Sequence, residues 1–303
     1  MQSTRALKAL ALASALTAAL GLAVASAAAG KPGKSTVCNV GSPDYATIQS
    51  AVDDTRCASI NLQATEYREN VVIDRDVEIR GAGPGLTTVR GIEGAVFRIP
   101  AVTPTPVVTL KGMTITGGSP SAPPSAPQLG ECYGGGGGID SSGAVLTVKD
   151  ALIVGNVSGT TYCFQPNQNW APARPGQGGG INSFRTMLEV KDSVIRDNVA
   201  DRCGGIRVGT NSPSMPSLAT ISDSRIEDND ADGSGFFNNN VTIPLGIGGG
   251  LCVTNPGGTL TIRDTTVTDN FAYEDGGGIY MVDGTLVIKD SDVSDNEPND
   301  IAP

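Results

Sequence analysis

One pattern of apolar and polar positions recurs five times along the second half of the chain. Each copy begins with Gly-Gly-Ile or Gly-Gly-Leu, continues as a short alternating apolar and polar stretch ending in Asp, and closes on Val/Ile-x-x-Asn. The copies cover residues 137–156, 179–198, 204–229, 249–270 and 277–296. An apolar residue always stands three and eight positions before the closing asparagine, and an aspartate stands six positions before it. A register this strict predicts that the five copies form the same structural unit and stack on one another.

The length of the repeat indicates what that unit is. Three copies span 17 residues from the isoleucine to the asparagine, and the shortest return, from Asn198 to Ile206, takes 8. A circuit of about 25 residues is typical of one coil of a β-solenoid, which buries its apolar face only when neighbouring coils stack. Within a coil, alternation points every second side chain inward, so columns of Leu, Val and Ile are expected. Less regular apolar segments at 71–73, 77–81, 96–99 and 107–115 predict two further coils.

We therefore predict an all-β fold, a single-stranded right-handed parallel β-helix (solenoid) of about seven coils with a short N-terminal capping helix. The helix is expected at about 43–54, with Ser42 as its N-cap and Pro43 at its first position. At the other end, Pro298 and Pro303 discourage further strand pairing. One domain then covers 30–303, with its regular repeats at about 135–296.

The first residues predict export. Arg5 and Lys8 precede an apolar stretch from Ala9 to Ala25, and small residues around position 27 offer cleavage sites. This arrangement is typical of a signal peptide, assigned to 1–29. The stretch is shorter and richer in alanine than a membrane span, which needs about 20 apolar residues. We expect no transmembrane segment in the mature chain and a secreted, extracellular or cell-surface location.

Charge narrows the range of partners. Removal of Arg5 and Lys8 leaves 19 basic against 31 acidic groups and takes the formal net charge from −10 to −12. Nucleic-acid binding requires a basic surface that neutralises phosphates, and the sequence contains no cluster of Lys and Arg. We therefore expect no nucleic-acid partner.

The six cysteines predict disulfides. The exported chain has an even number of cysteines, no CxxC pair and no histidine that would indicate a metal or redox site. Sequence order and the repeat register favour pairing of Cys38 with Cys57 and of Cys132 with Cys163. The pair of Cys203 with Cys252 then follows by elimination.

The Gly-Gly-Ile and Val/Ile-x-x-Asn motifs resemble the GGA[ILV] and FxxN repeats of polymorphic outer-membrane proteins and, more broadly, the pectin-lyase-like β-helix superfamily. The resemblance covers about 45–296, although Ile or Val replaces Phe in every FxxN-like copy. The segments 45–52, 67–71 and 79–83 are similar to the N-terminal coil of pectinesterases. The resemblance implies the β-helix fold and brings polysaccharide lyases, glycosidases and esterases into consideration.

Two classes of function follow. The chain has no histidine for a Gly-His-Gly element, and it has no match to the pectinesterase Gln/Asp/Asp/Arg set. Arg185, Arg196 and Arg225, the candidates for a lyase base, stand isolated in the sequence. We expect a secreted, non-catalytic binding or adhesion module for a polysaccharide or cell-envelope partner, with no required cofactor. The alternative is a carbohydrate-active enzyme, namely a polysaccharide lyase, esterase or glycosidase.

Ligand binding is expected on the edge formed by the connections between each asparagine and the next Gly-Gly. Long insertions of a solenoid stack on one side and commonly mark the binding face, and here they fall at 119–136, 157–178 and 230–248. Aromatic rings suit stacking on sugars. The predicted ligand-binding residues are Tyr133, Tyr162, Phe164, Trp170, Phe236, Phe237 and Tyr273. The alternative is that these rings pack inward and only hold the loops on the coils.

One acidic segment predicts a calcium site. Asp228, Asp230 and Asp232, followed by Gly233, match the first half of a D-x-D-x-D-G loop, in which alternate carboxylates converge on Ca²⁺. The closing glutamate is missing, because Asn239 stands at its position, so further ligands would come from elsewhere. The alternative is an acidic, solvated turn.

The two polar columns are interpreted as structural. Asparagine amides repeating at ~4.8 Å are expected to hydrogen-bond to one another and to turn backbone. The aspartates suit turns, where their side chains bond to nearby backbone. Their charge partners are predicted to be the basic residues one position earlier: Lys149, Lys191, Arg263 and Lys289.

Overall fold

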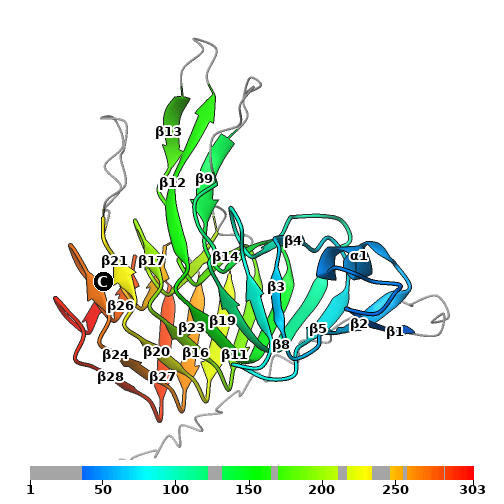
Figure 1. The fold of residues 1–303 in the computed structure, drawn as a ribbon. Coiled ribbons are helices and arrows are strands. Elements are labelled where there is room, and N and C mark those ends of the chain that lie inside the picture. The colour runs from blue at the N-terminus through cyan, green and yellow to red at the C-terminus, as the bar shows by residue number, and fades with distance from the viewer. Residues whose placement is uncertain are drawn as a thin grey trace, which may run out of the picture. The chain divides into compact units, whose positions relative to one another are not determined.

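The strands of the protein form three sheets built mainly from parallel pairs (Figure 1). The computed structural model describes residues 36–121, 132–164, 170–210, 217–233, 246–254, 258–282 and 284–303, with backbone only at 132–136, 164 and 170–174. Each regular coil but the last contributes a strand to each sheet. Equivalent residues of successive coils pair in parallel register, as Ile139 does with Ile181 and Ile181 with Ile206. The predicted all-β parallel β-helix is confirmed.

Sheet A is the largest, with 15 strands among the described residues. Its main path is β1 (Thr36–Asn39), β2 (Cys57–Asn61), β5 (Val77–Arg80), β8 (Val107–Thr116), β11 (Val145–Val154), β15 (Met187–Lys191), β19 (Leu218–Ser222), β23 (Thr259–Arg263) and β27 (Thr285–Lys289). Beside this path lie β3 (Glu66–Arg68), β6 (Thr88–Arg90), β16 (Val194–Arg196), β20 (Arg225–Glu227), β24 (Thr266–Thr268) and β28 (Asp292–Ser294). Strands β1 and β27 are therefore the two ends of the main path.

Sheets B and C complete the coils. Sheet B carries the Gly-Gly-Ile strands and runs through β4 (Val71–Val72), β7 (Phe97–Ile99), β10 (Ile139–Ser142), β14 (Ile181–Phe184), β18 (Ile206–Gly209), β22 (Leu251–Val253), β26 (Ile279–Met281) and β29 (Ile301–Ala302). Sheet C contains β9 (Cys132–Gly136), β12 (Val157–Phe164), β13 (Trp170–Arg174), β17 (Val199–Ala200), β21 (Asp230–Ala231) and β25 (Phe271–Ala272). The sequence did not predict the first coil strands β1 and β2, nor any strand in the insertions that hold β9 and β13.

A short helix covers the N-terminal end of the core, as predicted, but it begins later than expected. Helix α1 (Ile48–Asp53) buries Ile48, Ala51 and Val52. Its N-cap is Thr47 rather than Ser42, because the Thr47 hydroxyl accepts a hydrogen bond from the Ser50 backbone N–H at 3.0 Å and forms a capping box with it. Among the described residues, no helix has the length and apolarity required to cross a membrane.

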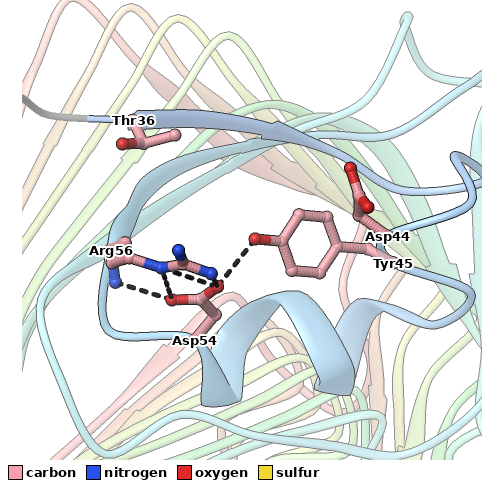
Figure 2. A pocket seen from close by; sticks show the side chains of 5 residues that line it. All are labelled: Thr36, Asp44, Tyr45, Asp54 and Arg56. Carbon is pink, nitrogen blue, oxygen red and sulfur yellow. Dashed lines mark hydrogen bonds and ion pairs between the residues drawn. The ribbon is translucent and has the colours of Figure 1, made fainter.

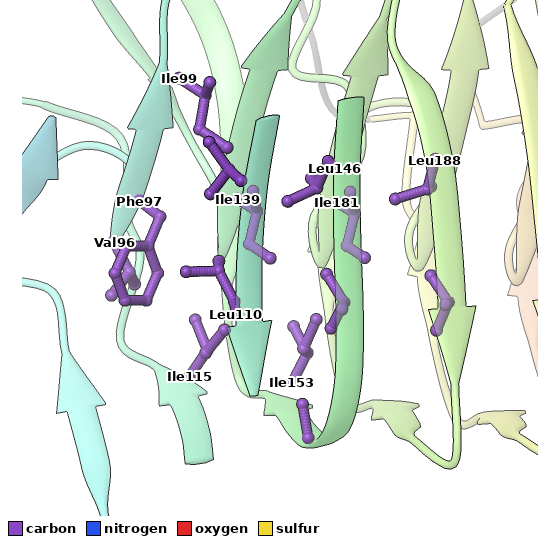
Figure 3. Packing of buried hydrophobic residues seen from close by; sticks show 14 of the residues in the cluster. Val96, Phe97, Ile99, Leu110, Ile115, Ile139, Leu146, Ile153, Ile181 and Leu188 are labelled. Carbon is purple, nitrogen blue, oxygen red and sulfur yellow. The ribbon is translucent and has the colours of Figure 1, made fainter. Parts of the chain in front are cut away.

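The core consists of apolar columns that run from coil to coil. Figure 3 shows apolar side chains of successive strands projecting between the sheets, among them Ile139, Leu146, Ile153 and Ile181. The columns predicted three and eight positions before the asparagines are fully buried in all regular coils but the last. Complete burial of one such side chain contributes about 1.5–3 kcal/mol. Burial therefore explains why these positions hold Leu, Val or Ile in every copy.

The asparagine column forms a continuous buried ladder, as predicted. The Asn156 Nδ2 donates to Asn198 Oδ1 at 2.9 Å, Asn198 to Asn229 at 3.0 Å, and the series continues through Asn270 to Asn296 at 2.9 Å for each step. Each of the first four residues also donates its backbone N–H to the side-chain oxygen of the next coil. The Asn198 amide further donates to Ile153 O at 3.0 Å. One side chain thus joins three coils.

The ladder explains the Gly-Gly motif. A Cβ atom on Gly180 would lie 2.8 Å from Gly205 O of the next coil and 3.1 Å from Asn198 Nδ2 of its own coil. The equivalent Gly250 would meet Gly278 O at 2.7 Å and Asn270 Nδ2 at 3.0 Å. Any side chain there would separate the coils or displace the amide. Glycine and asparagine are therefore required together.

The aspartate column occupies tight bends, as predicted. Asp150, Asp192, Asp223, Asp264 and Asp290 have φ between 47° and 51°, and a second series directly before the ladder asparagines, Asp197, Asp228, Asp269 and Asp295, has φ between 54° and 58°. Asp and Asn tolerate this left-handed conformation better than other non-glycine residues. Aspartates of the first series that follow a basic residue were predicted to pair with that residue. Instead, Lys149 pairs with Asp192 and Lys191 with Asp223, so each lysine pairs with the aspartate of the next coil.

Disulfides join neighbouring coils. Cys38 is bonded to Cys57 between β1 and β2, and Cys203 is bonded to Cys252, so both of these predicted pairs are confirmed. Cys163 is also disulfide-bonded, and it stands opposite Cys132 in the register of β9 and β12. No described cysteine is a free thiol.

Replacement of a middle rung, Asn198→Ala, tests the ladder. The change leaves the Asn156 backbone N–H, the Asn156 amide and Ile153 O without this partner, and each unsatisfied buried group costs about 1–3 kcal/mol. Urea denaturation should show the free energy of unfolding falling by about 3 kcal/mol or more. Asn61→Ala, which removes an exposed amide bonded to Asn39, should change it by only about 0.5 kcal/mol. Equal losses in the two variants would contradict a special role for the ladder.

Candidate functional site

An antiparallel extension interrupts the regular coils at β12. The strand begins as an ordinary coil strand, with Val157 and Ser158 paired in parallel to Val199 and Ala200 of β17. It then continues to Phe164 in antiparallel pairing with β9 on one side and β13 on the other. Figure 1 shows these three strands running away from the stacked coils. The insertions that the sequence marked as loops are therefore in part a small sheet.

The register of this extension brings together four of the predicted ligand-binding positions. Phe164 pairs with Trp170, and Tyr162 pairs with Tyr133. Directly paired residues, and residues two apart on one strand, belong to the same face of a sheet. The four aromatic positions therefore share one face, and Cys132 and Cys163 occupy positions of the other. The sequence indicated these residues by composition but could not show that they pair.

A buried aspartate anchors the base of the extension. The Asp201 side chain, only 3% exposed, accepts hydrogen bonds at Oδ2 from Thr160 Oγ1 and from the Gly176 backbone N–H, both at 2.7 Å. The backbone of Arg202 adds bonds to Gly176 O at 3.0 Å and from the Gly178 N–H at 3.2 Å. Charge-assisted bonds to a carboxylate are stronger than neutral ones. Both ends of the insertion are thus held to the following coil.

The other predicted aromatic residues are not brought into this group. Tyr273 lies on the coil edge after β25 and is 72% exposed, and β25 is separated from β12 by β17 and β21 in sheet C. Phe236 and Phe237 lie outside the described residues. The register thus groups only the four extension positions, and ligand binding at these residues stays a prediction.

The calcium prediction remains a prediction. Asp228 is one of the bend aspartates that precede ladder asparagines, so its place in the D-x-D pattern has a structural cause. Burial raises the pKa of the Asp230 carboxyl, and the neighbouring Asp232 carboxylate raises it further. In the part of the chain that the structure describes, no group of three or more His, Cys, Asp or Glu side chains is placed to hold a metal ion. Asn239, at the loop position of the closing ligand, lies outside the described residues.

Arginines gather at sheet B in a way that the sequence did not indicate. The guanidinium of Arg207 donates to Asn182 Oδ1 at 2.9 Å and to Thr254 Oγ1 at 3.1 Å. The Cζ atom of Arg207 lies 5.4 Å from the centre of the Phe184 ring. The Cζ atom of Arg185 lies over the same ring, 5.1 Å from its centre. The sequence suggested that Arg185 is isolated, but in the structure it contacts the Phe184 ring. Cation–π contact and hydrogen bonds fix this cluster in place.

The other two arginines named as candidate bases form ion pairs with acidic residues one or two positions away in the sequence. Arg196 forms an ion pair with Asp197, and Arg225 forms one with Glu227 at 3.7 Å. Both pairs are solvent-exposed. Exposed pairs of this kind contribute little to stability.

A polar pocket of about 460 Å³ lies at the N-terminal end, lined by Thr36, Asp44, Tyr45, Asp54 and Arg56 (Figure 2). The Tyr45 hydroxyl donates to Asp54 Oδ2 at 2.7 Å, and Arg56 donates to Asp54 through Nε at 2.9 Å and Nη2 at 2.6 Å. These contacts hold the pKa of Asp54 well below its usual range and raise the pKa of Tyr45. Neither group therefore changes protonation near neutral pH, where general acid–base catalysis operates best.

No protein-family model and no curated protein sequence matches this chain. The resemblance to pectin-lyase-like and polymorphic outer-membrane repeats therefore depends on the motifs themselves.

Substitution of Asp230 by asparagine should stabilise the protein at neutral pH. The Asp230 Oδ1 is buried without a hydrogen-bond partner, and its pKa is raised in the folded state, so the folded protein binds this proton more tightly than the unfolded chain. The charged carboxylate therefore destabilises the fold above the carboxyl titration range, and the penalty disappears as pH falls through it. Thermal unfolding should show Asp230→Asn with a higher melting temperature at about pH 7 and no gain at about pH 3. The exposed Asp290→Asn serves as control, and a loss of stability in Asp230→Asn at about pH 7 would refute the expectation.

Proposed function

We propose that this protein is an extracellular, non-catalytic binding or adhesion module that engages a glycan or a cell-envelope component through the extension formed by β9, β12 and β13. The observation that carries the proposal is the strand register, which assigns Tyr133, Tyr162, Phe164 and Trp170 to one face. These positions come from three strands that leave the coils. A row of this kind is suited to a ligand longer than one sugar ring.

The chemistry of the row favours a sugar surface. Aromatic rings combine a flat apolar face with polar edges, and aromatic residues dominate the binding energy of many interfaces. The whole chain carries a formal net charge of −10, which disfavours polyanionic ligands. A neutral glycan is therefore the ligand class that we favour.

The way in which the extension is held supports a binding role. Asp201 fixes both ends of the insertion to the next coil, and the disulfide at Cys163 lies within the extension itself. A surface ordered before it meets its ligand loses less conformational entropy on binding. This arrangement supports affinity from a modest number of contacts.

The disulfides are consistent with an extracellular location. The bonds Cys38–Cys57 and Cys203–Cys252 link neighbouring coils, and such bonds persist mainly in oxidising compartments. The predicted signal peptide at 1–29 agrees with this location. Secretion is therefore part of the proposal.

The enzymatic alternative has less support from the described residues. A polysaccharide lyase, esterase or glycosidase needs carboxylates and a base or nucleophile arranged around one substrate position. The charged groups of the N-terminal pocket are bonded to one another, and Arg185, Arg196 and Arg225 are engaged locally. Among the described residues, neither the pocket nor these arginines therefore provide the arrangement that such an enzyme requires.

Single alanine substitutions at Trp170 and Tyr162 test the proposal. The wild-type mature protein is first screened on an array of neutral and uronic-acid oligosaccharides, and the strongest binder is titrated by calorimetry. Loss of one stacking ring should weaken binding about tenfold or more, because such residues typically contribute over 1 kcal/mol. The melting temperature should remain that of the wild type.

Tyr273→Ala is the matched control, because it removes an exposed aromatic ring from the coil edge outside the extension. It should leave binding unchanged. The proposal fails if Trp170→Ala and Tyr162→Ala bind as tightly as wild type, or if they lose stability in step with binding. Turnover of any polysaccharide in the same panel would instead favour the enzymatic alternative.

A further inference from the structure

Residues 297–302 cover two of the three sheets beyond the last regular coil. Strand β29 pairs in parallel with β26 and completes sheet B, and Glu297 bridges to Phe271 at the end of sheet C. The asparagine ladder is also terminated, because Asp300 Oδ1 accepts hydrogen bonds from both the Asn296 backbone N–H and the Asn296 amide, each at 3.0 Å. Asp300 thus occupies the place that the asparagine of another coil would take.

Sheet A receives no such cover from the described residues. Strand β27 pairs with β23 on one side, and it is the last strand of the sheet A path. Ile288, in the column where Ile262 is fully buried, is 40% exposed, and Leu286 and Val293 are only partly buried. In the part of the chain that the structure describes, these apolar core positions are therefore left uncovered at the β27 edge.

The opposite end of sheet A is different. Cys38 in β1 and Val40 directly after it are buried, and α1 packs Ile48, Ala51 and Val52 over the adjoining core. The Cys38–Cys57 disulfide ties β1 to β2. Among the residues described from Thr36 onward, the N-terminal end thus has no exposed core column to offer to the C-terminal end of another copy.

Backbone geometry identifies the groups that face outward from β27. The Thr285 N–H donates to Gly258 O at 2.9 Å, and Lys289 O accepts from the Asp264 N–H at 3.2 Å. Thr285, Val287 and Lys289 therefore turn their backbone groups toward β23, because N–H and C=O of one residue point to the same side of a strand. Leu286 and Ile288 turn theirs toward the open edge.

We propose that this edge pairs with the same edge of a second copy of the chain, in an antiparallel twofold arrangement centred on Val287. In this register Leu286 of each copy stands opposite Ile288 of the other, and the outward N–H and C=O groups of both residues form paired hydrogen bonds. The two residues are also the uncovered core positions of β27, so apolar side chains meet apolar side chains. Pairing extends both cores and both sheets A at once.

The charges on the strand fit this register. Thr285 of one copy stands opposite Lys289 of the other, so no two like charges face each other across the pair. The acidic segment from Asp290 to Asp300 follows the strand, and in an antiparallel pair the two segments lie beyond opposite ends of the junction. Closed twofold contacts are the commonest form of self-association. Natural edge strands that escape pairing are usually protected by charge, bulges or proline, whereas the centre of β27 is the apolar sequence Leu286-Val287-Ile288.

Cross-linking through a single introduced cysteine tests the register directly. Val287 would face itself across the twofold axis as a non-hydrogen-bonded pair, with Cα atoms about 4.5 Å apart, a separation that permits a disulfide. The secreted full chain carrying Val287→Cys should form a dimer on mild oxidation that a reductant dissolves. Thr285→Cys should not form one, because two residues at this position would be about 13 Å apart. Equal cross-linking of both variants, or of neither, would overturn the proposal.

Sedimentation of the unmodified chain provides a second and independent measurement. The wild type should sediment as a dimer that dissociates on dilution, and Ile288→Lys, which places charges in the apolar contact, should sediment as a monomer with an unchanged circular dichroism spectrum. Ile301→Lys is the matched control, because Ile301 is 44% exposed at the same end but belongs to sheet B. It should remain dimeric. A wild-type monomer at every concentration would overturn the proposal and favour an added strand from another protein as the occupant of the edge.

Discussion

The buried asparagine ladder is the interaction on which the coil stack depends. Its amides donate to side-chain and backbone oxygens of neighbouring coils, and its oxygens accept both the amide and the backbone N–H of the coil before. Shifting any coil by one residue would leave several buried groups unsatisfied, so the ladder imposes a single register. The Gly-Gly motif follows from it, because a Cβ on Gly180 would collide with the next coil and with Asn198. Asp300 ends the series by presenting a carboxylate oxygen to Asn296.

Each coil combines a segment whose sequence pattern is fixed with a connection whose length varies. The segment from Gly-Gly to Asn holds the ladder, the aspartate bends and the apolar columns. The connection from Asn to the next Gly-Gly holds the insertions. The extension built from β9, β12 and β13 arises there without disturbing the register, since Val157 and Ser158 still pair with β17 as in a plain coil. The coils thus support the insertions, and the insertions carry the surface proposed to bind.

Much of the fold could be predicted because it repeats. The Gly-Gly-Ile starts, the ladder asparagines and the bend aspartates appear in fixed order, and the predicted amide ladder and disulfides at Cys38 and Cys203 are present. Features that occur once could not be predicted in this way. Pairing of Phe164 with Trp170 leaves no periodic signal, and burial of Asp201 depends on an insertion from the preceding coil. Asp228 fitted a calcium pattern in the sequence, although its position belongs to the repeated bend.

Hydrogen exchange measured by NMR tests the central role of the ladder most directly. The backbone N–H groups of Asn156, Asn198, Asn229 and Asn270 each donate to the side chain of the next coil at 3.0–3.2 Å. If the ladder holds the stack together, these amides should exchange only through global unfolding, with one shared free energy equal to that from denaturation. Exchange of these amides with a free energy well below that from denaturation would show that the coils open at the ladder and would contradict the account.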